Sequence, residues 1–131
     1  MTTRFELSTD QRVEIVDITS KVSDVVDIDD GICIVFVKHT TAGLTVNEKE
    51  SRLVSDIEEF LKKAVPENDG YAHDEIDDNA DAHLRSMLLN TSLTIPVENG
   101  DLALGTWQSI LFFEGDGPRQ RTVTVKTIGQ E

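Results

Sequence analysis

The alternation of hydrophobic and polar residues near the N-terminus predicts two strands followed by a short helix. Segments 4–9 and 11–19 both place apolar residues at alternating positions, and a turn cluster of Ser, Thr and Asp separates them. Val22, Val25 and Val26 then follow the i, i+3, i+4 spacing of one helix face. We therefore expect a strand pair and a helix before the first long apolar segment.

The most hydrophobic segment, residues 31–39, is apolar on both alternating sets of positions. This pattern predicts a central strand that is buried on both faces and ends at His39. A Thr-Thr-Ala-Gly corner allows the chain to turn tightly, and a second strand is expected over 43–48. The period then changes to that of a helix over 49–65, whose apolar face is expected to comprise Leu53, Ile57, Phe60, Leu61 and Ala64.

Residues 66–79 are polar and are expected to form a long loop, after which helical spacing resumes over 79–89. The last third alternates like strands, with a hairpin turn at Asn99-Gly100; the strands are expected over 92–100, 105–116 and 119–128. Helices interrupt the strands rather than alternate with them. The pattern therefore predicts one α+β domain over residues 1–131, an antiparallel or mixed sheet sandwich with two or three packed helices.

Composition makes the chain acidic and excludes two classes of partner. Asp and Glu number 25 against 12 Lys and Arg, which gives a formal net charge of −13. Without a basic stripe, nucleic acid is not expected as a partner. No apolar run of about 18 residues and no apolar leader is present, so we expect no membrane association and a cytoplasmic location. The acidic surface is also typical of a salt-rich cytoplasm, where screening removes self-repulsion.

Three histidines and a group of carboxylates supply the candidate metal ligands. His39 ends the apolar strand, His73 lies in the polar segment, and His83 is on the core side of the helix over 79–89 or at the edge of that side. Asp77 and Asp78 precede that helix. Imidazole and carboxylate groups are ligands for Zn²⁺ or Mg²⁺. A hydrogen-bonded structural role stays open for each histidine, since the spacing contains no HxxxH pair.

Other side chains near the C-terminus suit an anionic substrate. Arg119 and Arg121 share one face of the last strand, and guanidinium groups suit phosphate oxygens, with surface solubility as the alternative. Glu114 ends a largely apolar strand, where a carboxylate needs either a partner or a catalytic role. Trp107, the only tryptophan, lies at the start of that strand and can pack in the core or wall a pocket.

Three longer segments together resemble the YjbQ family of small proteins, also labelled secondary thiamine-phosphate synthases. The resemblance covers the chain from Phe5 to Ile128 and rests on the motifs KHTTAGLTVNE, DDNADAHLRSMLLNTSLTIPVENGDLALGTWQSI and GPRQRTVTV. It implies an α+β subunit that assembles as a homotrimer, with sites near the subunit boundaries. It also implies that His39, His73 and His83, with neighbouring acidic residues, build a polar pocket able to hold a divalent metal ion.

The activity attached to the family joins hydroxymethylpyrimidine pyrophosphate to thiazole phosphate, releasing pyrophosphate and giving thiamine phosphate. The catalytic residues that this function implies are His39, Thr40, His83 and Glu114. The implied substrate-binding residues are Thr41, Asn47, Trp107, Gln108, Arg119 and Arg121. The implied ligands of a Mg²⁺ or Zn²⁺ ion are His39, His73, Asp77, Asp78 and His83.

Two other functions stay open at this point. A binding protein would sequester a metal or a small phosphorylated metabolite without catalysis. A metal-dependent hydrolase would use a zinc-bound water held by three imidazoles. The partner expected of the transferase is likewise a small phosphorylated molecule.

Overall fold

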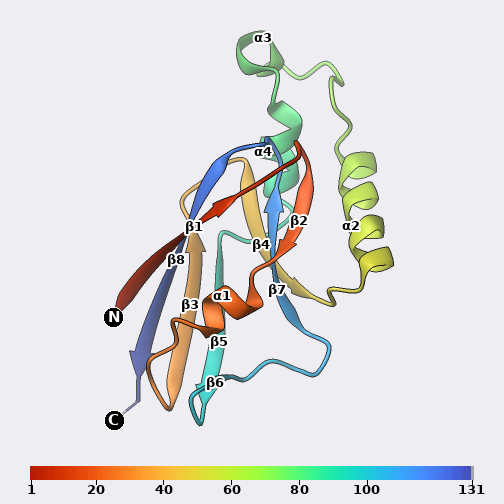
Figure 1. The fold of residues 1–131 in the computed structure, drawn as a ribbon. Helices are drawn as coiled ribbons and strands as arrows, with labels where there is room; N and C mark the ends of the chain where they lie inside the picture. The colour runs from red at the N-terminus through yellow and green to blue at the C-terminus, as the bar shows by residue number, and fades with distance from the viewer. Residues whose placement is uncertain (131) are drawn as a thin grey trace.

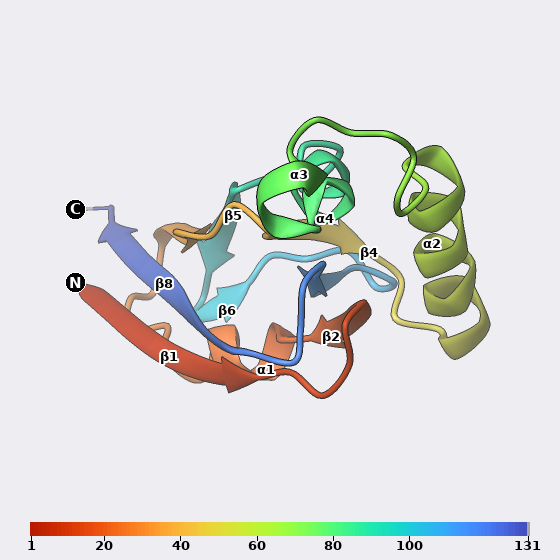
Figure 2. The same ribbon diagram turned by 90° about the horizontal axis from the view of Figure 1, so that it is seen from above.

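Two antiparallel sheets stacked face to face form the body of the protein in the computed structural model, which describes residues 1–130 (Figure 1 and Figure 2). The larger sheet has the order β1-β8-β3-β5-β6, and the smaller has the order β2-β7-β4. The strands are β1 (Thr2–Ser8), β2 (Glu14–Asp17), β3 (Gly31–Val37), β4 (Ala42–Asn47), β5 (Ser92–Glu98), β6 (Asp101–Leu102), β7 (Ser109–Glu114) and β8 (Gln120–Gly129). The α+β sandwich predicted from the sequence is confirmed.

Four helices occur in the described residues, rather than two or three. They are α1 (Thr19–Ser23), α2 (Ser51–Ala64), α3 (Asp74–Asp77) and α4 (Ala80–Ser86). Helices α2 and α4 lie beside the smaller sheet, on the side away from the larger one (Figure 2). No helix within residues 1–130 has the length and apolar character needed to cross a bilayer.

The core lies between the two sheets, and β3 contributes only one of its faces to it. The inward, buried residues of β3 are Cys33, Val35 and Val37. On the opposite face Ile32 and Ile34 are half-buried, and Phe36 is 37% exposed. The prediction of a strand buried on both faces is therefore wrong for β3. It is central within its sheet, but the outer face of that sheet stays open to solvent.

Strand β7, the middle strand of the smaller sheet, is the one buried on both faces. Ile110 and Phe112 belong to the core between the sheets. Successive side chains of a strand point to opposite faces, so Leu111 and Phe113, which are also buried, lie on the other face of the smaller sheet. Strands β2 and β4 pair with its two edges. Glu114 ends the strand with the same parity as Ile110 and Phe112, so its carboxylate enters the core.

Helix α2 packs through a face that differs in part from the predicted one. Leu61 is buried, and Leu53 and Ile57 are half-buried, but Phe60 is 63% exposed and Ala64 is exposed. Neighbouring residues of a helix project about 100° apart. The contact face is centred on Ile57 and Leu61, so the prediction that Phe60 and Ala64 pack is wrong.

Local hydrogen bonds explain where other elements differ from prediction. Helix α1 ends at Ser23, because the N–H groups of Val25 and Val26 bond only three residues back, as in a turn. The segment expected to be a loop contains α3. The predicted hairpin turn is confirmed, since Asn99 and Gly100 have φ of 52° and 83°, as a two-residue turn with positive φ at both positions requires. The turn leads into β6, which was not predicted, whereas the strand expected over 105–116 begins only at Ser109 and lies in the smaller sheet.

Candidate functional site

His39 lies two residues beyond the end of β3, where the chain turns toward β4. Its Nε2 atom accepts a hydrogen bond from the Thr122 N–H at 3.2 Å, so a neutral ring carries its proton on Nδ1. Burial and the charge of Arg121 lower the pKa of this imidazole, against opposing effects of the Thr122 hydrogen bond and the Glu114 charge. His39 is therefore a neutral ring at neutral pH.

The corner that follows His39 is shaped by close packing rather than by a tight turn at its glycine. Gly43 lies within β4, and a Cβ atom at this position would be 3.0 Å from Cβ of Leu89. The backbone of Leu44 also exchanges hydrogen bonds of 2.7 and 2.9 Å with Asn90. The absence of a side chain at Gly43 thus lets the segment after α4 lie against the corner that carries His39.

His39 and His83 line the same cavity, which has a volume of about 540 Å³. His83 comes from α4 and is half-buried. The other residues that line it are Thr40, Ala42, Ser86, Met87, Leu89, Asn90 and Thr91. Within residues 1–130, the lining offers imidazoles, hydroxyls and an amide, with a partly apolar wall and no carboxylate. We call this cavity the histidine cavity.

The third histidine joins this group through His83. The rings of His73 and His83 meet edge to face, with centroids 4.9 Å apart and an interplanar angle of 81°. Nε2 of His73 lies 3.0 Å from Oδ1 of Asn79, whose amide nitrogen donates to Asp116 at 2.9 Å. The fold therefore brings His73 to His83 and His83 to the cavity of His39, although His73 does not itself line that cavity.

The predicted metal ligands do not fit a metal site within a single chain. Among residues 1–130, no group of three or more His, Cys, Asp or Glu side chains is arranged to hold a metal ion. Nε2 of His39 is occupied by a backbone N–H and that of His73 by a side-chain amide. Asp77 and Asp78 are exposed. Metal binding by these five residues stays a prediction.

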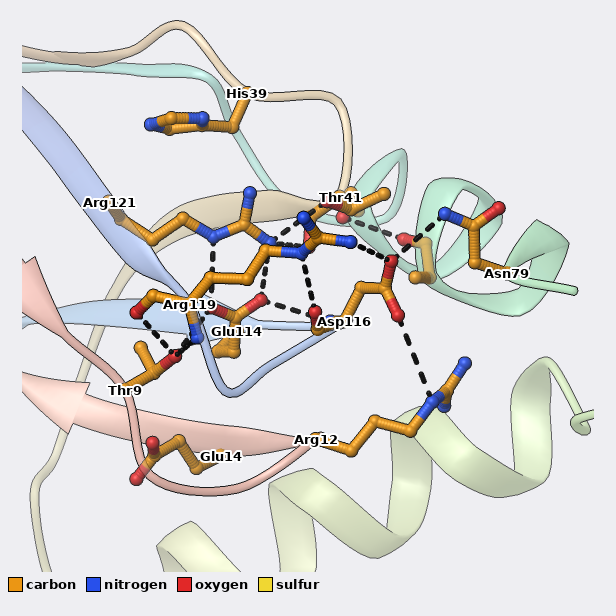
Figure 3. Close-up of polar contacts among 12 residues, drawn as sticks. Thr9, Arg12, Glu14, His39, Thr41, Asn79, Glu114, Asp116, Arg119 and Arg121 are labelled. Carbon is orange, nitrogen blue, oxygen red and sulfur yellow. Dashed lines mark hydrogen bonds and ion pairs between the residues drawn. The ribbon is translucent and has the colours of Figure 1, made fainter. Parts of the chain in front are cut away.

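Glu114 and Arg121, expected to act on substrate, bind each other in the core (Figure 3). Arg121 donates from Nε to Oε1 of Glu114 at 2.9 Å and from Nη2 to Oε2. Glu114 also accepts hydrogen bonds from the Thr9 hydroxyl at 2.8 Å and the Asp116 N–H at 2.9 Å. Burial opposes ionisation of Glu114, but the hydrogen bonds from Arg121, Asp116 and Thr9 outweigh it and lower its pKa.

The ion pair of Glu114 and Arg121 also explains the position of Thr41, which was expected to bind substrate. Its hydroxyl accepts a hydrogen bond from Nη2 of Arg121 at 2.9 Å, and Thr41 is buried. Figure 3 shows the His39 ring lying over Arg121, so the ion pair forms the floor beneath the imidazole. Glu114, Arg121 and Thr41 therefore lie near His39 but do not line the histidine cavity.

A second buried ion cluster, which the sequence analysis missed, fixes α4. Asp81 is 1% exposed and accepts two hydrogen bonds of 2.9 Å from Arg12. Arg85 lies 2.8 Å from the same carboxylate, four residues along the helix. Burial opposes ionisation of Asp81, but the bonds and charges of the two arginines outweigh it and lower its pKa. The i, i+4 spacing of Asp81 and Arg85 was the available signal.

The remaining predicted residues lie outside the histidine cavity. Trp107 is 73% exposed and lines a separate cavity of about 400 Å³. Gln108 lines another of about 230 Å³, and Asn47 accepts a hydrogen bond from a neighbouring backbone N–H. Arg119 donates to the carbonyl and the carboxylate of Asp116, at 2.7 and 3.0 Å.

Sequence and fold both match one family of proteins. The family model described as UPF0047 protein YjbQ-like matches residues 3–130. The chain belongs to the YjbQ/UPF0047 family. The resemblance inferred from the motifs is therefore confirmed over almost the whole chain.

Relatives of the YjbQ/UPF0047 family align over nearly their full length. A UPF0047 protein of Archaeoglobus fulgidus is 54% identical over 122 residues, which are 93% of this chain and 97% of the relative. A hypothetical protein from Aeropyrum pernix has a crystal structure that superposes with a TM-score of 0.96 at 42% identity, covering 99% of each chain. A YbjQ-like protein of unknown function from Sulfolobus solfataricus gives 0.96 at 40% identity, covering 99% of this chain and 97% of that one.

Proposed function

We propose that this YjbQ/UPF0047 protein is a transferase of the thiamine-phosphate synthase type, with its substrates bound in the histidine cavity. One observation supports the proposal most directly: His39 and His83 line one cavity together with hydroxyl and amide groups. Hydroxyls, amides and imidazole N–H groups can all donate hydrogen bonds to phosphate oxygens. The apolar wall can accept the face of a heteroaromatic ring.

The reaction breaks the bond between the pyrimidine methylene carbon and an oxygen of pyrophosphate, and forms a bond from that carbon to the thiazole nitrogen. Negative charge develops on the departing oxygen. His39, neutral and with its proton on Nδ1, is suited to donate a hydrogen bond to that oxygen. His83, across the same cavity, supplies a second imidazole that can donate a proton to the released pyrophosphate. No step of this mechanism passes through a metal.

The proposal is tested with purified protein, hydroxymethylpyrimidine pyrophosphate and thiazole phosphate. We expect His39→Ala and His83→Ala each to lower the rate of pyrophosphate release by about 10²- to 10⁴-fold. The melting temperature should change little, because both rings are only half-buried. Lys38→Ala is the matched control, since Lys38 is exposed beside His39 and does not line the cavity.

Unchanged turnover in both histidine variants would overturn their catalytic roles. A wild type that binds the pyrimidine pyrophosphate in a calorimeter but releases no pyrophosphate would favour the binding protein instead. Hydrolysis of phosphate esters that stops on metal removal would favour the hydrolase. Elemental analysis of the purified protein tests the separate prediction of a bound Mg²⁺ or Zn²⁺ ion.

We also propose that the protein is a homotrimer that buries the outer face of the larger sheet. This face carries a contiguous apolar row on β3 and β8. Its members are Ile32, Ile34, Phe36 and Ile128. Ile32 and Ile128 are paired across the strands, and Phe36 and Ile128 are 37% and 47% exposed. A patch of this kind is typical of a protein–protein interface.

Substituting a charge into this row is expected to dissociate the assembly. The wild type should elute with three times the chain mass of 14.6 kDa in size-exclusion chromatography with light scattering, and Phe36→Glu with the mass of one chain. Phe60→Glu is the matched control, because Phe60 is an exposed aromatic residue on α2, away from the sheet. A wild-type mass of a single chain, or equal masses for the two variants, would contradict the prediction.

A further inference from the structure

Another cavity, of about 520 Å³ and called the second cavity below, lies on the other side of α4 from the histidine cavity. It is lined by Gln11, Arg12, Val13, Lys62, Pro66, Glu67 and Arg85. His83 and Arg85 are two residues apart on the helix and so project about 200° apart. The two cavities share no lining residue.

The lining of this second cavity is cationic in a protein that is strongly anionic. Arg12, Lys62 and Arg85 are three of only 12 Lys and Arg in the chain, and Glu67 is the one carboxylate in the lining. The chain as a whole has a formal charge of −13. Asp81 pairs with both Arg12 and Arg85 from behind the lining, so it offsets part of this charge. The positive charge that remains is complementary to a small anion and not to a cation.

Arg85 gives the cavity a fixed positive charge. Its side chain is 3% exposed, and Nε donates to the carbonyl of Val65 at 2.9 Å. Nη1 is closed off from solvent and lies 2.8 Å from the Asp81 carboxylate, so it belongs to the ion pair with Asp81. A guanidinium held in place by Val65 and Asp81 offers a ligand in the cavity a charge that needs no reorientation.

Arg12 already holds a carboxylate at the mouth of the cavity. Its Nη1 lies 2.9 Å from Glu67, which is 49% exposed, and its other acidic contacts are Asp81 at 2.9 Å and Asp116 at 3.9 Å. The contact of Arg12 with Asp81 is buried and bidentate. The contact with Glu67 is an exposed ion pair, and such pairs contribute little to the free energy of unfolding. An incoming oxyanion would therefore compete with Glu67 alone.

We propose that this cavity binds the phosphate or carboxylate group of a small metabolite, with Arg85 as its fixed base and Arg12 and Lys62 at its mouth. Lys62 is 45% exposed on α2, and within residues 1–130 its one ion-pair contact is Glu59 at 3.9 Å. Its charge also acts on Glu58, and both glutamates are on the surface of α2, so the ammonium group can turn toward a ligand. The volume of about 520 Å³ leaves room for the rest of a small metabolite beyond its anionic group. The proposal is independent of any reaction in the histidine cavity.

Calorimetric titration with inorganic phosphate, and separately with citrate, at constant ionic strength tests this proposal. We expect the wild type to bind at least one of them, which also identifies the anionic group. Lys62→Gln should weaken that binding about tenfold through loss of a charge-assisted hydrogen bond. Glu67→Gln should tighten it about threefold by removing the competitor.

Lys63→Gln is the matched control, because Lys63 carries the same charge on the next position of α2 and does not line the cavity. It should bind phosphate or citrate like the wild type. Equal weakening by Lys62→Gln and Lys63→Gln would show that the anion responds only to the overall charge of α2, and this would overturn the proposed binding site. A wild-type protein that binds neither phosphate nor citrate at millimolar concentrations would also overturn the proposed binding site.

Discussion

Glu114→Ala is expected to lower the free energy of unfolding by about 3–5 kcal/mol, because it leaves the charge of Arg121 buried without a partner. Arg121 is 5% exposed and Glu114 is fully buried. The hydroxyl of Thr9 and the N–H of Asp116 also lose their acceptor. Urea unfolding at neutral pH measures the change. Glu98→Ala, at an exposed position, should change it by less than about 0.5 kcal/mol.

A second variant separates loss of the ion pair from loss of packing. Changing both Glu114 and Arg121 to apolar residues removes both charges together, so part of the stability should return. Equal stability of Glu114→Ala and the wild type would show that Arg121 finds another partner or is solvated.

Acidification from about pH 7 to about pH 3 is expected to destabilise the protein strongly. Glu114 and Asp81 have pKa values below their ordinary values of 4.5 and 3.8. The unfolded chain therefore binds protons before the folded one does, and the stabilisation present above these values is lost as pH falls through the folded pKa values. Each unit of pKa difference contributes about 1.4 kcal/mol.

His39 acts in the same direction at higher pH, since its pKa lies below 6.5 in the folded protein. Stability is therefore also lost as pH falls below 6.5, where the unfolded histidine becomes protonated first. Chemical denaturation measured across this pH range checks the prediction. In Glu114→Gln the loss on acidification should be smaller than in the wild type, because one titrating carboxylate is gone. A flat stability profile in the wild type would contradict the argument.

The strands were predictable from local patterns, whereas their faces and neighbours were not. A continuous apolar run located β3, alternation located β8, and the hairpin turn at Asn99-Gly100 was predicted. Apolar residues on both sides of β3 could not reveal that only one side meets the core, because an interface with another chain gives the same pattern. Helix α3 has four residues and no apolar period, so nothing marked it within the polar segment.

The candidate site shows the same limit. The residue types and the family resemblance both selected His39 and His83, and the fold places both at one cavity, although they are far apart in the sequence. Arg12 and Asp81 meet across 69 positions, and no local spacing connects them. Glu114 was a candidate because a carboxylate on an apolar strand needs either an interaction partner or a catalytic role. In the structure its interaction partner is Arg121.

The burial of β7 on both faces has a consequence for measurements on this protein. All six of its side chains are buried, and both of its edges are paired with neighbouring strands. Its amide hydrogens can reach water only when the sandwich separates as a whole, whereas the ends of β6 or α3 can open locally. Deuterium uptake at β7 therefore reports the complete opening of the molecule, and uptake elsewhere can be read relative to it.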